Sequence, residues 1–412
     1  MKRKKKAIAV VAAVLILCLA AALTGCGSSA VKNAQVAENT ATRSAQTAAS
    51  DGKADSAAAV GTAVSVGASE RFTARDLSQT ADLSEATSVP VSDGETVTIT
   101  EAGVYVLSGS AENATVVVDA GDEDKVQLVL DGLSIVNAHQ ACILVENADK
   151  VFLTSAEGSE NALTVSGKFT GDEDAAVFSR DDLVLNGLGT VTVSSTGDGI
   201  RSNDDLKLTG GTWIVTASDC AIKAHDGIYA CDGEYELVAG SDGLHAEDSD
   251  DDTIGSIVID GGSFTVQAGD DGIHATTGVT VNGGTLAIRA AEGIEATQVT
   301  INSGTVGIQA TDDGINAGRK SGSLSVKIEI NGGQITIAIG AGDTDAVDSN
   351  GNLIITGGTI DITAQSPFDY DGSCSYTGGT IIVNGVETDS VSNQMMGGGM
   401  AGGAPGGFGG RR

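Results

Sequence analysis

The chain is poor in aromatic and in basic residues. Aromatic side chains make up 3% of its 412 residues, and 23 Lys and Arg face 55 Asp and Glu, for a net charge of −32. Flat, cellulose-type chains usually stack on a row of exposed aromatic residues, and so low an aromatic content argues against such a row. The acidic charge excludes nucleic acid and anionic lipid as direct partners and favours cations. It would also repel an acidic polymer unless a metal ion intervened.

The N-terminus has the features of a secretory signal. It begins with KRKKK, continues with the apolar run AIAVVAAVLILCLAAAL and ends in Leu23-Thr24-Gly25-Cys26, which resembles a bacterial lipobox. We therefore predict a signal peptide over residues 1–25, with Cys26 as the lipidated first residue of the mature protein. An ordinary signal peptide or an uncleaved anchor is the alternative. The lipid would hold the protein at the extracellular face of the cytoplasmic membrane, the bacterial cell surface.

Two further segments lack the apolar residues of a folded domain. Residues 26–87 consist mainly of Ala, Ser, Thr, Gln and Asp, which predicts a disordered tether. Residues 391–412 are rich in Gly and predict a flexible tail. The folded part is therefore expected over residues 88–390.

A repeat organises that folded part. Its small residues Gly199, Ala221, Gly243, Gly272, Gly293, Gly314 and Ala346 follow one another at steps of 22, 22, 29, 21, 21 and 32. Within each unit apolar and polar residues alternate strictly, as they do in β-strands. A fixed period of alternating strands predicts an all-β solenoid, a right-handed parallel β-helix with about 21–22 residues per coil. The two long steps indicate insertions, at about 247–255 and 318–326.

Residues one period apart should lie above one another, about 4.8 Å apart. Three apolar columns are then expected to form the core. They are Ile200, Ile222, Leu244, Ile273, Ile294, Ile315 and Val347; Val215, Val266, Ile288, Ile308, Ile337 and Ile362; and Trp213, Phe264, Leu286, Val306, Ile335 and Ile360. Gly-Gly pairs mark the corners, where a positive φ is needed.

A fourth column is acidic. It contains Asp198, Cys220, Asp242, Asp271, Glu292, Asp313 and Asp345, with further acids beside it at Asp219, Asp270, Asp312 and Asp343. Two carboxylates about 5 Å apart repel by roughly 3 kcal/mol at an effective dielectric constant of 20. Calcium would relieve this repulsion, because Ca–O distances of about 2.4 Å let one ion bridge two coils. We predict Ca²⁺ sites at the Asp residues of this set. Ordinary Asx turns are the alternative, since Asp-Gly is a common turn dipeptide.

Beside the acidic column runs one candidate for catalysis. The residues that follow the first apolar column are Arg201, Lys223, His245, His274, Glu295, Asn316 and Asp348. A polysaccharide lyase would use Lys223 or Arg201 as the base that removes a proton next to a uronate carboxyl group. Neutralisation of nearby Asp side chains by the same residues favours the charged form, which suits a base poorly. His245 and His274 could be ligands or solvent-facing members of the column. No Cys–His spacing indicates zinc.

Several long motifs resemble a known family. YVLSG (105–109), LVLDGLSI (128–135), NADKVFLTSAEGSENALT (147–164), AAVFSRDDLVLNG (175–187) and GDGIRSNDDLKLTGG (197–211) are similar to segments of surface carbohydrate-binding β-helix proteins of clostridia and related bacteria. That family is similar in fold to pectate-type polysaccharide lyases. The resemblance implies calcium at the acidic turns and binding of plant-type polysaccharides, including acidic ones. Cys220 and Glu292 depart from its acidic pattern, which puts an ion at their coils in doubt.

Together these features predict a monomeric, lipid-anchored protein that binds a uronate-containing, pectin-like polysaccharide with the help of Ca²⁺. A polysaccharide lyase is one alternative. A non-catalytic adhesin or wall spacer, in which calcium only stiffens the solenoid, is the other.

Overall fold

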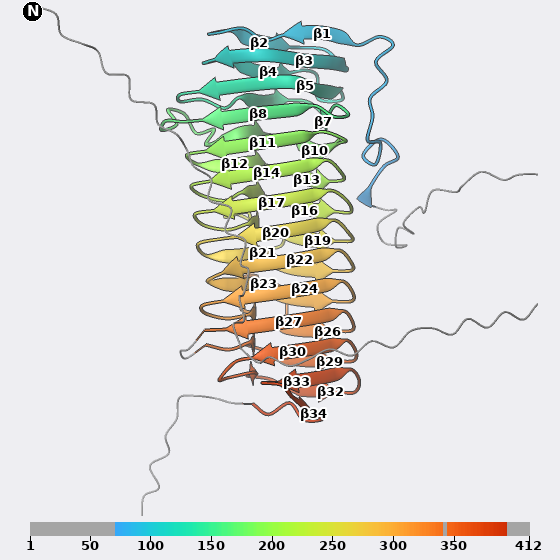
Figure 1. The fold of residues 1–412 in the computed structure, drawn as a ribbon, viewed down its shortest axis with the longest axis vertical. Helices are drawn as coiled ribbons and strands as arrows, with labels where there is room; N and C mark the ends of the chain where they lie inside the picture. Colours follow the sequence, from blue (N-terminus) through green and yellow to red (C-terminus); the bar gives the residue numbers. More distant parts are fainter. Residues whose placement is uncertain (1–70, 341–343, 394–412) are drawn as a thin grey trace, which may run out of the picture. The chain divides into compact units, whose positions relative to one another are not determined.

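The computed structural model describes residues 71–340 and 344–393. These residues form 34 strands, stacked coil upon coil as a parallel β-helix (Figure 1). The all-β solenoid predicted from the repeat is confirmed. Within the described residues, no helix has the length and hydropathy needed to span a bilayer.

Each regular coil contributes one strand to each of three parallel sheets, and β3, β5, β21 and β23 each take part in two of them. Sheet 1 contains β1 (Thr87–Pro90), β3 (Gly103–Glu112), β5 (Lys125–Asn137), β7 (Lys150–Ser155), β10 (Asp182–Gly187), β13 (Asp205–Leu208), β16 (Gly227–Ala230), β19 (Ser256–Ile259), β21 (Asp271–Val281), β23 (Glu292–Ile301), β26 (Lys327–Ile330), β29 (Asn352–Ile355) and β32 (Cys374–Tyr376).

Sheet 2 begins with the second halves of β3 and β5. It continues with β8 (Glu160–Val165), β11 (Thr190–Ser195), β14 (Thr212–Ala217), β17 (Glu234–Ala239), β20 (Ser263–Gln267), β22 (Thr285–Ala290), β24 (Thr305–Ala310), β27 (Gln334–Ile339), β30 (Thr359–Thr363) and β33 (Thr380–Val383). The last strand, β34 (Val386–Thr388), pairs antiparallel to β33.

Sheet 3 carries the acidic repeat. Its strands are β2 (Thr96–Ile99), β4 (Thr115–Asp119), β6 (Ile143–Asn147), β9 (Ala175–Ser179), β12 (Asp198–Ser202), β15 (Ile222–Ala224), β18 (Leu244–Ala246), the first halves of β21 and β23, β25 (Ile315–Ala317), β28 (Val347–Ser349) and β31 (Asp369–Tyr370).

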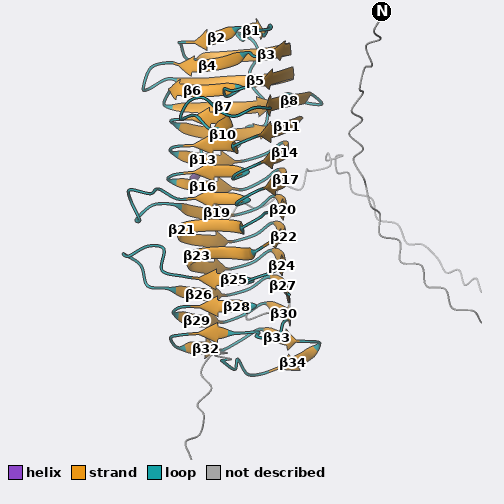
Figure 2. Cartoon of the chain, turned by 90° about the vertical axis from the view of Figure 1, so that its left-hand side faces the viewer, coloured by secondary structure: helices purple, strands orange, loops and turns teal. Residues whose placement is uncertain are grey.

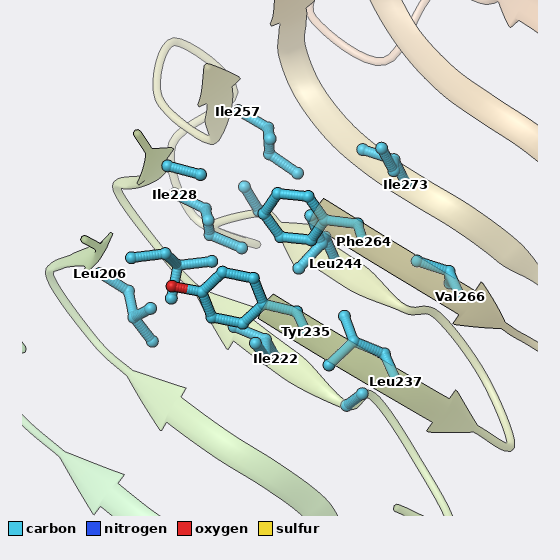
Figure 3. Packing of buried hydrophobic residues seen from close by; sticks show 14 of the residues in the cluster. Leu206, Ile222, Ile228, Tyr235, Leu237, Leu244, Ile257, Phe264, Val266 and Ile273 are labelled. Carbon is cyan, nitrogen blue, oxygen red and sulfur yellow. The ribbon is translucent and has the colours of Figure 1, made fainter. Parts of the chain in front are cut away.

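The three predicted columns form part of the core, together with inward residues of sheet 1 such as Leu206, Ile228 and Ile257. Ile200 pairs with Ile222, and each later member pairs with the next up to Val347. The other two columns also include Leu237 and Tyr235, and the ring of Tyr235 stacks on Phe264 with 4.7 Å between centroids (Figure 3). One coil alone could not bury these side chains, so the coils stabilise one another through the shared core.

Glycine is required at two kinds of position. The second Gly of each corner pair has a positive φ, for example 83° at Gly284 and 91° at Gly333. The Gly after the acidic column is closely packed: a Cβ on Gly272 would lie 2.2 Å from Ile288 Cγ2 in the same coil and 2.6 Å from the carbonyl oxygen of Gly293 in the next. A side chain at the first kind of position would be strained, and at the second it would clash.

Residues 71–86 differ from the disordered tether predicted from their composition. This N-terminal strap packs on the outer face of sheet 1 (Figure 1, blue), where Asp76 is fully buried and contacts Lys150 and Lys207. Gln79 accepts a hydrogen bond from the amide of Gly187 and donates one to the carbonyl of Thr209. Composition predicts disorder here because the segment has no run of apolar residues, but a few polar contacts hold it on sheet 1. The signal, Cys26 and the rest of the predicted tether lie outside the described residues.

Candidate functional site: the acidic face of sheet 3

The acidic column lies at the start of the sheet 3 strands, and its carboxylates connect successive coils. Asp198 Oδ1 accepts a hydrogen bond from the Cys220 amide at 3.0 Å, and Asp242 Oδ1 accepts one from the Asp271 amide at 2.9 Å. Asp313 Oδ1 accepts one from the Asp345 amide at 2.7 Å. Buried Asp side chains in this column therefore have a structural role even without a metal ion, because each satisfies a backbone donor of the neighbouring coil.

The acids of the column are buried or half-buried, whereas the described acids beside it in the sequence are exposed. Asp242 and Asp271 are each 5% exposed, and Asp198 is 1% exposed. The acids next to the column are solvent-exposed at Asp219, Asp270 and Asp312. Asp343 lies outside the described residues. Of the predicted calcium ligands, the column members therefore contact the neighbouring coil, and the described acids beside them face solvent.

A second column runs beside the first on the outer face of sheet 3. We call it the outer column. Its members stack in register in the order Arg201, Lys223, His245, His274, Glu295, Asn316, Asp348 and Asp369. Its character changes along the solenoid, from cationic through imidazole to acidic, so the face has three distinct parts.

The first part holds the candidate base. Arg201 donates to Asp174 at 2.8 Å, lies 3.0 Å from His225 Nε2 and packs its guanidinium over the ring of Phe178. The guanidinium group of Arg201 is therefore held in place by these three contacts. Burial raises the pKa of Asp198 to about 6, partly offset by the nearby positive charge of Lys223. One carboxylate oxygen of Asp198 is buried without a hydrogen-bond partner.

In the middle part, histidines contact the acids. His245 Nδ1 lies 2.6 Å from Asp242 Oδ2, and His274 Nδ1 lies 2.7 Å from Asp271 Oδ2. Burial opposes a charge on His274, but Asp271 and Glu295 outweigh it and raise its pKa to about 10. Glu295 also binds Lys320 at 2.7 Å. Although burial acts in the opposite direction, His274 and Lys320 hold the pKa of Glu295 well below its usual range.

In the third part, acids gather without cations. Asp348 pairs in register with Asp369, and no ion pair among the described residues includes Asp313, Asp348 or Asp369. Burial and the neighbouring carboxylates raise the pKa of Asp313 to about 6 and that of Asp348 to about 7. Asp369 Oδ1 is buried without a hydrogen-bond partner. The Asp345 side chain accepts a hydrogen bond from the hydroxyl of Ser366.

These three environments suit calcium unequally. Calcium takes six to eight oxygen ligands and is not attracted to carboxylates that are already paired with cations. The middle part offers imidazole and ammonium partners instead, so its carboxylates are already compensated. The third part offers only oxygen and carries an orphaned, buried carboxylate atom at Asp369. Among the described residues, the carboxylates of this part of the face that no ion pair compensates, and that could hold calcium, are therefore Asp313, Asp348 and Asp369.

Three members of this face lie outside the columns predicted from the repeat. Asp369 was not placed in the column, although it lies one 21-residue period after Asp348 and could have been found by extending the repeat by one coil. Glu247 and Lys320 were missed as well. Both lie in insertions that interrupt the period, so no repeat alignment could have assigned them a place.

Comparisons with known proteins identify one family and two similar proteins. The family model for "carbohydrate-binding domain-containing protein" matches residues 93–344. A relative of that name from Acetivibrio thermocellus is 39% identical over 129 residues, which cover 29% of this chain and 45% of the relative. The match thus spans less than half of the relative's length. A solved structure of a polysaccharide lyase-like protein from C. thermocellum, a gadolinium derivative, aligns with 19% identity and a TM-score of 0.29, over 73% of this chain and 97% of that chain.

The family match covers more than half of the chain, and it confirms the resemblance seen in the motifs between residues 105 and 211. The chain belongs to the family of carbohydrate-binding domain-containing proteins.

Proposed function

We propose that this protein binds polysaccharide at the bacterial cell surface, along the outer face of sheet 3. Membership of a carbohydrate-binding family supports carbohydrate binding in general. The solenoid offers a long face on which side chains recur at every coil, which suits a ligand that is itself a repeating polymer.

The finer proposal is that calcium joins the acidic face to a uronate-containing chain. The observation that carries it is the acidic end of the two columns. There Asp313, Asp348 and Asp369 lie together without a cation, and burial together with neighbouring carboxylates raises the pKa of Asp313 and of Asp348. A dication at this end would relieve the repulsion, and coordination positions not filled by protein would remain open to a sugar carboxylate.

The overall charge makes the metal necessary for such a ligand. With a net charge of −32, the chain repels a polyuronate at long range. Calcium reverses the sign of the local field where it binds. We therefore expect uronate binding to depend on calcium, whereas binding of a neutral polysaccharide would not need it.

We propose binding rather than catalysis. Arg201 is engaged with Asp174 and His225, and a guanidinium held by a carboxylate is a poor general base. Lys223 lies between Arg201 and His245 in the outer column, where it offsets the charge of Asp198. Two alternatives remain. One is a lyase that uses Lys223 or Arg201, and the other is a wall spacer that calcium stiffens.

Anchoring through a lipid on Cys26 completes the proposal. It would place the solenoid outside the cytoplasmic membrane, where wall and environmental polysaccharides are accessible. The supporting feature is the basic, apolar and small-residue pattern of residues 1–26.

Pull-down of the full chain on insoluble polysaccharides, with calcium and with chelator, tests the binding proposal. We expect retention on a uronate-rich polymer in calcium and release in chelator. Absorbance of unsaturated products on polygalacturonate should stay flat. A rise would favour the lyase, and absence of retention on any polymer would favour the spacer.

A further inference from the structure

The middle part of the outer column has the donors of a transition-metal site. His245 in β18 and His274 in β21 pair in register, and their rings stack with 4.8 Å between centroids and 13° between planes. Only 12% of each side chain is exposed. Two neighbouring imidazoles held face to face can offer nitrogen atoms to one ion.

Hydrogen bonds fix the same tautomer in both rings. Each Nδ1 contacts a carboxylate three residues earlier, in Asp242 and Asp271 respectively. An ionised carboxylate only accepts hydrogen bonds, so each Nδ1 must be the donor. A metal ion would displace the second proton of each ring, and the neutral ring would then offer its lone pair at Nε2. This carboxylate–histidine arrangement is the one that commonly orients zinc-binding histidines.

A carboxylate supplies a third donor. Glu247 Oε2 lies 3.2 Å from His245 Nε2, and ligand atoms of His245, Glu247 and His274 all lie within 4.8 Å of one another. In a tetrahedral zinc site the ligand atoms are about 3.3 Å apart, given metal–ligand bonds of about 2.0–2.1 Å. Closing the difference requires rotation of the exposed Glu247 side chain and also of the two imidazole rings, because stacked rings direct their nitrogen lone pairs side by side.

The two insertions enclose this part of the face. Both protrude on the same side of the solenoid, one between β18 and β19 and the other between β25 and β26 (Figure 2). They meet where the Gly322 amide donates to Asp252 Oδ2 at 2.6 Å. The first insertion contributes Glu247, and the second contributes Lys320, which neutralises Glu295. The loops therefore add a ligand and restrict solvent around the imidazole pair.

We propose that His245, His274 and Glu247 bind a divalent transition-metal ion of the zinc type. Two imidazoles and one carboxylate suit zinc, whereas calcium prefers oxygen alone. Three protein ligands leave one position for water or for an oxygen atom of a bound ligand. This site uses other residues and another metal than the calcium proposal above, so the two can fail separately.

The test is a titration of the full, chelator-stripped chain with Co²⁺ in excess Ca²⁺, followed by visible absorption, and then displacement by Zn²⁺. We expect one saturable equivalent with bands typical of nitrogen and oxygen ligands, lost when Zn²⁺ is added. His245→Asn and His274→Asn should each weaken binding at least 100-fold. Glu247→Gln, in an exposed loop that is not expected to affect folding, should weaken it about 10- to 100-fold.

His225→Asn is the matched control, because His225 lies nearby but binds Arg201 instead. It should leave Co²⁺ binding unchanged. Absence of saturable uptake by the wild-type chain would overturn the proposal. So would uptake that survives both Glu247→Gln and His274→Asn.

Discussion

The carboxylate of Asp76, which is fully buried, lies 3.6 Å from the ammonium group of Lys207, far along the chain in β13. Its other oxygen lies 3.6 Å from Lys150. This one side chain in the N-terminal strap thus contacts two lysines, each with a side chain only 10% exposed, in β7 and β13 on either side of β10 in sheet 1. Lys150 also contacts Asp182 of β10 at 3.2 Å. The strap is therefore part of the folded domain.

We predict that Asp76→Asn destabilises the domain by about 3–5 kcal/mol, because it leaves the largely buried ammonium group of Lys207 without its carboxylate and leaves Lys150 with Asp182 alone. Denaturant unfolding of wild type and variant measures the change. Glu85→Gln, an exposed position in the same strap, is the control and should change stability by less than about 0.5 kcal/mol. Equal stability of Asp76→Asn and wild type would show that the strap does not hold the domain.

A second prediction concerns the glycine that follows the acidic column. Gly272→Ala would place a Cβ 2.2 Å from Ile288 Cγ2 and 2.6 Å from the carbonyl oxygen of Gly293. We expect a loss of about 1–3 kcal/mol from overpacking, seen as a lower unfolding midpoint.

Gly307→Ala is the matched control in β24. A Cβ there meets nothing closer than 3.8 Å, and its φ is not positive. The substitution should be neutral or stabilise by up to about 1 kcal/mol, through the entropy of the unfolded chain. If the two alanine variants were equally stable, close packing at Gly272 would not be the reason for the glycine repeat.

The fold could be predicted because its cause is local and repeated. The alternation of apolar and polar residues predicts the strands, and the spacing of Gly199, Ala221 and Gly243 predicts the number of residues per coil. Together they predict which residues stack in the core columns. The site was harder to predict. The partners of Asp242 and Asp271 are histidines whose role depends on rotamers and on burial, and Glu247 comes from an insertion outside the repeat. Contacts across coils, such as Asp76 to Lys207, leave no periodic signal at all.

Without metal, the domain should become more stable as the pH falls from about 7.5 to about 5. Burial raises the pKa of Asp198, Asp204, Asp205 and Asp313 to about 6, and that of Glu292 and Asp348 to about 7. A carboxyl group whose pKa is higher in the folded state binds protons more readily when folded, so acidification favours folding until the unfolded chain also takes up protons near pH 4. His225, whose pKa is lowered by burial, opposes this trend below about pH 6.5.

Thermal melts in chelator across this pH range test the prediction. Asp348→Asn removes one of the contributing carboxylates and should make the pH dependence shallower. Added calcium should raise the melting temperature more at pH 7.5 than at pH 5.5, because protons and calcium compete for the same oxygens. A melting temperature that falls steadily on acidification in chelator would contradict the account.

We also predict that calcium uptake depends on the acidic end of the columns and not on the histidine pair. Asp369→Asn and Asp348→Asn should each weaken calcium binding at least tenfold, because each removes charge from a cluster that lacks cations. Asp270→Asn is the control, since Asp270 is exposed beside the histidine coils. Isothermal titration with calcium measures all three. Loss of calcium binding in Asp270→Asn alone would place the ion elsewhere.

Calorimetric titration of the full chain with Ca²⁺, followed by oligogalacturonate in calcium and then in chelator, tests the central claim most directly. The account predicts saturable calcium uptake, and sugar binding that appears in calcium and disappears in chelator. Absence of calcium uptake would contradict it. The acidic column would then serve only as the set of hydrogen-bond acceptors between coils that Asp198, Asp242 and Asp313 already form.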